Sequence, residues 1–332
     1  MGDIELVLPT AWDIEDKSPF IDIDSSGLKV SYTDPDDYEA VIVRVNNPIP
    51  SECGIFYFEI KIINKGKNGM IGIGYCTKQS DKKIDDSNYI NNMLMPGQEN
   101  EPWGCGYHGD DGYSFCSGSG EPYDLPRHEY TAGYTTGDII GCYLNFRSNI
   151  VFYTKNGINL GIECHLYSNF KGILYPCVGF RSQGGSLEVN FGNKNFKYSA
   201  ITNEDISQRS KNALTLKYQE KNYFIMGGYE NMLVNLTDEL TKSLKKEPNN
   251  AFELIYRGKI FFIMGKYDKA FEDLTRLLET EPDNTIALKY RGEINYIMKR
   301  YNESIADLEK LLRIQPNNEW AKMANKLVEG FL

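Results

Sequence analysis

The C-terminal part of the chain repeats itself with a period of 34 residues. The stretches KKEPNN, TEPDN and IQPNN set Pro248, Pro282 and Pro316 at intervals of 34 residues. Further positions keep this register: Tyr256 and Tyr290, Arg257 and Arg291, Gly258 and Gly292, Tyr267 and Tyr301, Leu274 and Leu308. A period of this length is typical of a helical hairpin that cannot bury its apolar face alone and therefore stacks on its neighbours.

One unit of the repeat predicts two helices. Residues 251–263 carry apolar side chains at helical spacing, and Gly265 ends that pattern. Residues 268–280 form a second predicted helix with leucines on one face. The small side chains of Gly258 and Ala270 would let the two helices approach closely. Pro282 cannot continue a helix, so it marks the start of the next unit.

This pattern resembles the tetratricopeptide repeat. Its marked positions are matched by Leu254, Gly258, Tyr267, Ala270 and Pro282, and then by Leu288, Gly292, Tyr301 and Pro316, with Ser304 in place of the usual alanine. We expect a degenerate unit at 213–250, full units at 251–284 and 285–318, and a capping helix at 319–332. The resemblance implies a concave peptide-binding groove. Clamp positions for a carboxylate fall on Ile255, Lys259, Lys289 and Glu293, of which only scattered lysines fit. A structural or self-associating array is the alternative.

Residues 1–200 predict an all-β domain. Its runs of β-branched and aromatic residues are VIVRV (41–45), IFYFEIKII (55–63), MIGIGYC (70–76), DIIGCYLNF (138–146), NIVFYTK (149–155), ILYPCVGF (173–180) and SLEVNF (186–191). Clusters of Gly, Asn and Asp separate them. The pair Asn156-Gly157 favours a two-residue hairpin turn, because both residues readily adopt positive φ. Short strands with turn signals at regular intervals indicate a β-sandwich.

The order of motifs in this region resembles the SPRY domain of the Ran-binding protein M type. GIFYFEIKI, IGIGYC, GYHGDDGYSFCS, TTGDIIGC, FYTKNGINLG, LYPCVGF and EVNFG follow one another in this order, and the match runs from about Pro9 to Tyr198. The resemblance implies a bent antiparallel sandwich, concanavalin-like in fold and without catalytic activity. The expected fold class is therefore multi-domain: an all-β sandwich at 1–200, a linker at 201–212 and an all-α repeat domain at 213–332.

The SPRY resemblance also implies a peptide-binding rim of loops. By motif order the contact positions are Tyr32, Tyr75, Leu94, Arg181 and Ser182. Tyr and Arg are frequent in recognition hot spots. The segment 87–103 adds further apolar side chains, among them Tyr89, Met93, Met95 and Trp103, which are either tucked under the sandwich or kept for a partner.

Charge and motifs exclude several functions. Residues 1–200 carry 16 Lys and Arg against 26 Asp and Glu, a net charge of −10, whereas residues 201–332 carry 20 of each. This balance disfavours nucleic acid, which needs a basic patch. No apolar window suits a membrane span, and we expect a cytoplasmic protein, with the nucleus as alternative. The seven cysteines lack a C-x-x-C pair, so we expect them reduced.

No catalytic motif stands out among the three histidines. The stretch GYHGDDGYSF groups His108, Asp110 and Asp111, which could be a metal or acid–base site or a turn between strands. Because Asp-Gly favours a hairpin, we expect a turn here and a structural histidine. The missing motifs and the SPRY resemblance, which implies a non-catalytic module, lead us to expect no enzyme activity, no cofactor and no metal.

The sequence thus predicts a protein-interaction adaptor. The SPRY rim would bind a peptide or loop of a protein partner, and the repeats would bind a second protein or mediate assembly, including self-association. One alternative is a substrate receptor or scaffold subunit of a ubiquitin-ligase complex. The other, from a different class, is a carbohydrate-binding β-sandwich.

Overall fold

The computed structural model describes residues 7–34, 40–51, 55–78, 95–98, 103–116, 119–122, 133–146, 149–166, 172–198 and 229–332. The chain divides into two compact units, formed mainly by Met1–Lys197 and by Gly228–Leu332. The expected linker at 201–212 lies outside the described residues, so the predicted domain boundaries stay predictions.

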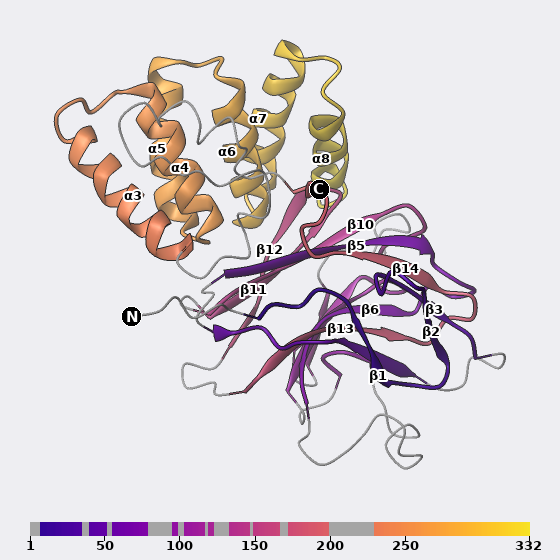
Figure 1. Cartoon of the computed structure of the whole chain (residues 1–332). Coiled ribbons are helices and arrows are strands. Elements are labelled where there is room, and N and C mark those ends of the chain that lie inside the picture. The colour runs from indigo at the N-terminus through magenta and orange to yellow at the C-terminus, as the bar shows by residue number, and fades with distance from the viewer. Residues whose placement is uncertain are drawn as a thin grey trace, which may run out of the picture. The chain divides into compact units, whose positions relative to one another are not determined.

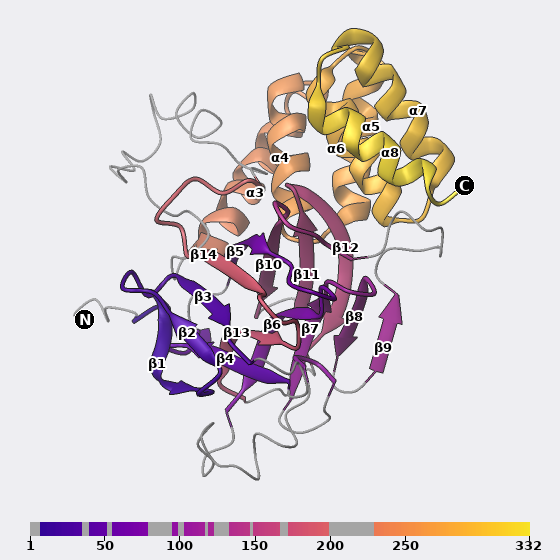
Figure 2. The ribbon, with the colours of Figure 1, turned by 90° about the vertical axis from the view of Figure 1, so that its right-hand side faces the viewer.

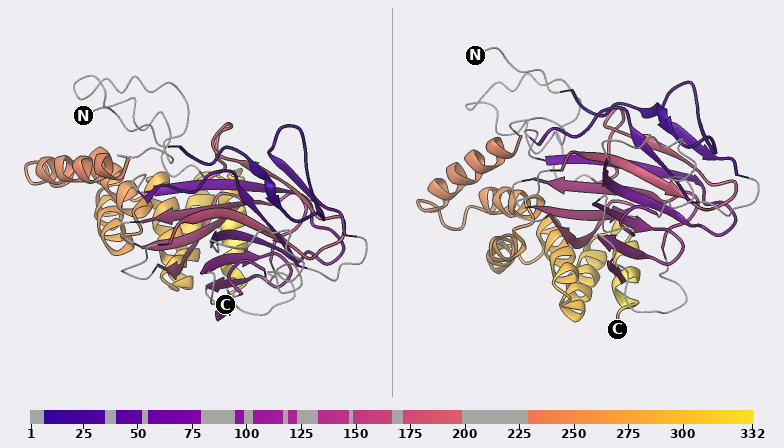
Figure 3. Two further views of the ribbon diagram at one scale, coloured as in Figure 1. Left: turned by 60° about the horizontal axis from the view of Figure 1, so that its bottom comes forward. Right: turned by 90° about the horizontal axis from the view of Figure 1, so that it is seen from below.

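The first unit is a sandwich of two antiparallel sheets, whose strands are drawn in Figures 1 and 3. One sheet has the order β1 (Trp12–Lys17), β4 (Val41–Val45), β13 (Leu174–Phe180), β6 (Ile71–Thr77), β7 (Gly104–His108), β8 (Tyr113–Cys116) and β9 (Ser119–Pro122). The other has the order β12 (Ile158–His165), β11 (Ile150–Lys155), β10 (Ile139–Asn145), β5 (Ile55–Asn64), β14 (Ser186–Asn190), β3 (Lys29–Tyr32) and β2 (Ile21–Ile23). The predicted all-β sandwich is confirmed.

Aromatic side chains fill the space between the two sheets. Phe58 on β5 and Tyr75 on β6 are both fully buried, and their rings meet edge to face at 5.6 Å. The hydroxyl of Tyr75 donates a hydrogen bond of 2.9 Å to the backbone carbonyl of Cys142 on β10. Because β6 and β10 belong to different sheets, this bond fixes Tyr75 as an inward-facing residue.

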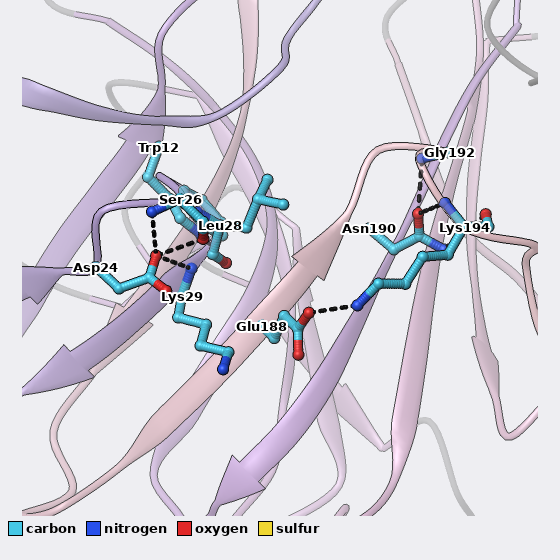
Figure 4. Close-up of polar contacts among 9 residues, drawn as sticks. All are labelled: Trp12, Asp24, Ser26, Leu28, Lys29, Glu188, Asn190, Gly192 and Lys194. Atoms are coloured by element: carbon cyan, nitrogen blue, oxygen red, sulfur yellow. Dashed lines mark hydrogen bonds and ion pairs between the residues drawn. The ribbon is translucent and has the colours of Figure 1, made fainter.

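Local turn chemistry ends the strands where the sequence predicts it. Asn156 and Gly157 have φ of 54° and 82°, as a type I′ hairpin turn requires. Figure 4 shows two further turns that short polar side chains close. The Asp24 carboxylate accepts hydrogen bonds from the backbone and hydroxyl of Ser26, and Asn190 accepts from the backbone of Gly192 and Lys194.

One expectation about the cysteines is wrong. Cys116 on β8 and Cys164 on β12 form a disulfide that joins the two sheets. Their separation of 48 residues gave no signal, because only the folded sandwich brings the two strands face to face. The other described cysteines, Cys76, Cys105, Cys142 and Cys177, are buried and form no disulfide, as expected.

The second unit is an array of helices (Figures 1 and 2): α3 (Tyr229–Leu244), α4 (Ala251–Ile263), α5 (Tyr267–Thr280), α6 (Thr285–Ile297), α7 (Tyr301–Ile314) and α8 (Glu319–Glu329). The two predicted full units correspond to α4–α5 and α6–α7, and α8 is the predicted capping helix. None of the helices in the described part of the chain is both long and apolar enough to cross a membrane.

Asparagines start the first helix of each unit. The side chains of Asn250, Asn284 and Asn318 accept hydrogen bonds from the backbone N–H three residues later, at 3.2, 3.0 and 3.0 Å. These N-caps satisfy donors that a helix start leaves unpaired. In the sequence the prolines mark the unit boundaries, and the structure adds these caps, which follow each proline by two residues.

Polar side chains repeat the 34-residue register inside the array. Arg257 on α4 forms an ion pair of 2.6 Å with Asp273 on α5, and Arg291 pairs with Asp307 at 2.6 Å in the next unit. Each arginine also donates to a threonine one helix earlier, Thr241 or Thr275. The helices approach closely at Gly258, where an added Cβ would lie 3.2 Å from Leu274.

Candidate functional site

Two loops at one end of the sandwich are tied into a single platform. We call residues 65–70, between β5 and β6, and 181–185, between β13 and β14, the loop platform. Ser182 is its centre, because its hydroxyl donates to the carbonyl of Lys65 at 2.8 Å and accepts from the backbone of Gly69 at 3.1 Å. The side chain of Asn68 donates to the carbonyl of Arg181 at 3.0 Å. The backbone of both loops is therefore fixed from several sides.

The loop platform presents cations to solvent. Arg181, Lys65 and Lys67 are exposed, and no carboxylate of the described residues forms an ion pair with any of the three. This cluster is notable because it lies in the acidic half of the chain. An exposed guanidinium on an ordered backbone can pair with a carboxylate through two parallel hydrogen bonds.

The structure describes four of the five predicted contact residues, and these four differ in exposure. Arg181 alone among the four described ones is exposed. Tyr75 and Ser182 are fully buried, Tyr75 in the core and Ser182 in the loop platform, so neither side chain reaches the surface. Tyr32 is buried too, and its hydroxyl donates to Asp34 at 3.0 Å. Leu94 lies outside the described residues. Peptide binding by this set stays a prediction.

A short turn, Met95–Gln98, lies flat on the face of the sheet opposite to Tyr75. Glycines make room for it: an added Cβ at Gly179 would lie 2.5 Å from Pro96 Cδ and 3.0 Å from Met95 Sδ. Met95 is 3% exposed and Trp103 is 8% exposed. Of the two interpretations of this segment, tucking under is therefore right for these residues. Tyr89 and Met93 fall outside the described residues.

The end of β6, which precedes the Met95–Gln98 turn in the chain, is hydrogen-bonded to Trp103, which follows that turn. Thr77 donates both its backbone N–H and its hydroxyl to the carbonyl of Trp103, at 2.9 and 3.1 Å. The last residue of β6 and the residue before β7 are thus joined by hydrogen bonds.

The GYHGDDG stretch forms the hairpin turn between β7 and β8. Gly112 has φ of 73°, and the carboxylate of Asp111 accepts from the backbone of Tyr113 at 2.9 Å, so the predicted turn is confirmed. His108 forms a 2.9 Å hydrogen bond to the carbonyl of Pro96, which pins the Met95–Gln98 turn. Burial lowers the pKa of His108, and burial together with Asp111 raises the pKa of Asp110.

The helical unit carries a second cluster of cations. Lys289 lies 4.5 Å from the ring centre of Trp320 and 5.5 Å from that of Tyr290, and Lys259 lies 5.4 Å from the same Tyr290 ring. These residues come from α4, α6 and α8, which pack on one another in that order. Burial lowers the pKa of Lys289; Glu293 opposes the shift and Lys259 adds to it.

The sequence indicated both lysines and one of the aromatic residues around them, but not Trp320. Tyr290 was visible in the repeat register with Tyr256. Trp320 shares the register of Phe252 and Ile286, a large apolar position in each unit. The 34-residue spacing of these three apolar residues is the sequence feature from which Trp320 could have been predicted.

A family model for the SPRY domain matches residues 55–194, and one for the tetratricopeptide repeat matches residues 291–318. The chain contains an SPRY domain followed by tetratricopeptide repeats. The SPRY match begins at the first residue of β5 and extends beyond β14, so it includes the loop platform. Both kinds of domain are modules that bind proteins or peptides.

Curated relatives share the SPRY region. Ran-binding protein 10 of Danio rerio is 38% identical over 201 residues, which cover 60% of this chain and 30% of that protein. Ran-binding protein 9 of Homo sapiens is 39% identical over 199 residues, covering 58% and 24%. The Ran-binding protein M homolog of Arabidopsis thaliana is 32% identical over 240 residues, covering 68% and 46%. The chain therefore spans less than half the length of each of these relatives.

Solved structures include similar SPRY domains. The SPRY domain of human HERC1 is 15% identical and covers 56% of this chain and 100% of its own, with a TM-score of 0.41. A human SPRY domain is 23% identical and covers 53% and 98%, with a TM-score of 0.39.

Proposed function

We propose that this chain is a non-catalytic adaptor. Its SPRY domain binds a short peptide or loop of one protein at the loop platform, and its helical repeats bind a second protein. The observation that carries the proposal is Arg181, an exposed guanidinium on a loop whose backbone is fixed by Ser182 and Asn68. The two domains also differ in net charge, −10 for residues 1–200 and zero for residues 201–332, which fits two separate partners.

The mechanism proposed at the loop platform is recognition by a preformed surface. Fixed loops lose little conformational entropy on binding, so more of the contact energy becomes affinity. Arg181 offers a planar fork of donors to a carboxylate or to backbone carbonyls of an extended peptide. Lys65 and Lys67 on the neighbouring loop favour an acidic segment and would raise its association rate at low salt. In this proposal the buried Tyr32 and Ser182 hold the loop platform in place, and Tyr75 stabilises the sheet from which the platform loops extend.

The proposed second surface is the face of α4, α6 and α8 around the half-buried Lys289, with Lys259 and Tyr290 buried beneath it. Lysines over aromatic rings combine apolar area with charge, a combination found at interaction hot spots. Assembly of the chain with itself through the repeats is the alternative use of this face. The protein would act in the cytoplasm, with the nucleus as alternative.

The test is capture of partners from a lysate with the full chain and four single variants. Arg181→Ala is compared with Lys29→Ala, which removes an exposed cation on β3, far along the chain from the platform. Lys289→Ala is compared with Lys326→Ala, an exposed lysine of α8. We expect Arg181→Ala and Lys289→Ala to lose different partners, and the two controls to lose none.

Three outcomes contradict parts of this proposal. If Arg181→Ala keeps every partner, the platform is not the binding surface. If both test variants lose the same partners, the chain has one binding surface rather than two. If a glycan array shows saccharide binding that Arg181→Ala leaves intact, the sandwich is a carbohydrate-binding domain. Ubiquitin-ligase subunits among the captured proteins would favour the role of substrate receptor or scaffold.

A further inference from the structure

The hairpin turn after β7 brings three metal-ligating side chains together. One ring nitrogen of His108 and one carboxylate oxygen each of Asp110 and Asp111 lie within 4.8 Å of one another. Two bonds of about 2.0–2.2 Å from one ion to nitrogen and oxygen span at most about 4.4 Å, so donors at the 4.8 Å limit would have to draw closer together around a bound cation. The adaptor function proposed above uses none of the three residues.

His108 is held as a metal-binding histidine would be. Its side chain is 2% exposed, and its ring packs against Phe115 with centroids 4.4 Å apart. Nε2 lies 2.9 Å from the carbonyl oxygen of Pro96, which can only accept, so Nε2 carries the proton. The neutral ring therefore has its lone pair on Nδ1, and no described residue donates a hydrogen bond to that atom. A backbone carbonyl that binds the second ring nitrogen is the usual support of a histidine ligand.

Asp110 carries an unpaired buried oxygen. Its Oδ1 is inaccessible to solvent and has no hydrogen-bond partner among the described residues. The neighbouring Asp111 adds a second carboxylate, and no lysine or arginine of the described residues forms an ion pair with either. A buried, unpaired carboxylate oxygen beside a like charge is costly. A bound cation would remove both the desolvation cost and the repulsion.

We propose that His108, Asp110 and Asp111 bind a divalent first-row transition-metal ion of the zinc class. One imidazole and two carboxylates are donors that suit Zn²⁺, whereas Ca²⁺ and Mg²⁺ prefer sites made of oxygen alone. Three ligands from the chain leave one tetrahedral position for water or for a donor from a bound protein. Because His108 also holds Pro96, the ion would fasten the hairpin turn to the Met95–Gln98 turn on the same face of the sheet.

The test is calorimetric titration of ZnCl₂ into the full chain, purified through a chelator with the Cys116–Cys164 disulfide intact. The variants are Asp110→Asn and Asp111→Asn, which keep side-chain size and spare the buried histidine. Asp22→Asn, an exposed carboxylate of β2, is the matched control. We expect one zinc ion per chain and a higher melting temperature with zinc for the unmodified chain and Asp22→Asn. Asp110→Asn should bind at least about tenfold more weakly, since changes even to supporting residues cost that much.

Cobalt(II) distinguishes this site from adventitious binding to cysteine. Co²⁺ bound by His108, Asp110 and Asp111 gives weak visible bands without thiolate-to-metal charge transfer in the near ultraviolet. Strong charge transfer would assign the ion to a cysteine and overturn the proposal. Absence of zinc binding, or equal affinity in Asp110→Asn, Asp111→Asn and the unmodified chain, would also overturn it. None of these outcomes depends on whether the loop platform binds a protein.

Discussion

Lys299 adopts the same left-handed backbone conformation as Gly265, which occupies the equivalent position 34 residues earlier. Their φ angles are 60° and 70°. At both positions the next residue donates its N–H to the carbonyl five residues before it, Lys266 to Phe261 and Arg300 to Asn295, at 2.8 Å each. This is the glycine-type helix end of a Schellman motif, and in the second unit a lysine occupies the glycine position.

Replacing Lys299 by glycine should stabilise the helical unit. A side chain in the left-handed region costs roughly 1–2 kcal/mol, so Lys299→Gly is expected to raise the free energy of unfolding by about 1 kcal/mol. Urea denaturation followed by circular dichroism measures the change. The reciprocal variant Gly265→Ala should lower stability by a similar amount. A neutral result for both would show that this helix end does not limit stability.

Lys289→Met should also stabilise the helical unit at neutral pH. The pKa of Lys289 is lowered below its usual 10.5, mainly by burial, so the folded state holds its proton less tightly than the unfolded state does. The charge therefore costs stability at every pH below the folded pKa, and the cost fades as pH rises toward 10.5. Thermal unfolding from pH 7 upward should show an advantage for the variant that shrinks with pH. A constant advantage would point to packing instead.

Asp273→Ala should weaken the helical unit strongly. The variant leaves Arg257 without its ion pair between α4 and α5. Breaking a fully buried pair costs about 3–5 kcal/mol, and because the Arg257 side chain is 16% exposed we expect about 2–3 kcal/mol. Chemical denaturation measures this loss in the free energy of unfolding. The double variant Arg257→Met with Asp273→Leu should recover most of the loss, and its failure to do so would show that the two groups act independently.

Gly179→Ala should release the Met95–Gln98 turn. The added Cβ would collide with Pro96 and Met95, so the turn must lift from the sheet. Hydrogen exchange should quicken at residues 95–98, and the fluorescence of nearby Trp103 should change. Val178→Ala, one residue away on β13 and facing the core, removes apolar contacts instead. Equal exchange in the two variants would mean that Gly179→Ala acts only through global stability.

Tyr75→Phe separates a structural role from a binding role. The variant removes the hydroxyl that bonds the Cys142 carbonyl across the core, and a lost hydrogen bond of this kind costs about 1 kcal/mol. We expect that loss in urea denaturation and no change in partner capture. Loss of partners from a chain that remains folded would restore Tyr75 to the binding surface.

Much of the fold could be predicted from the sequence because its signals are local. The strands β4, β5, β6, β10, β11, β13 and β14 lie within one residue or so of the predicted runs. The hairpin at Asn156-Gly157 and the helices α4 to α7 follow from turn chemistry and periodicity. Strands β1, β2, β3 and β9 were missed because they are short and lack a long apolar run. The disulfide between Cys116 and Cys164 was missed because it depends on how the sheets pack.

The candidate site was harder to predict, since motif order gives a position in the chain but not the face that a side chain occupies. Tyr75 shows this. In I-G-I-G-Y the alternation sets Tyr75 on the same face as Ile71 and Ile73, which already indicates the core. Arg181 was found because it follows a strand directly. Ser182 is a different case, because its role depends on contacts with a loop more than 100 residues away.

The hydrogen bonds between Thr77 and Trp103 have an evolutionary consequence. These bonds join the end of β6 to the residue before β7. The pairing of β6 with β7 therefore does not depend on the number of residues in the connection between them. The entropy of closing such a loop grows only slowly with its length, about 0.6 kcal/mol for each doubling. Insertions and deletions between Lys78 and Met95, ahead of the packed Met95–Gln98 turn, are therefore expected to be nearly neutral for folding. This connection is the point at which related chains can diverge in length, and at which foreign sequence could be grafted, while the sandwich stays the same.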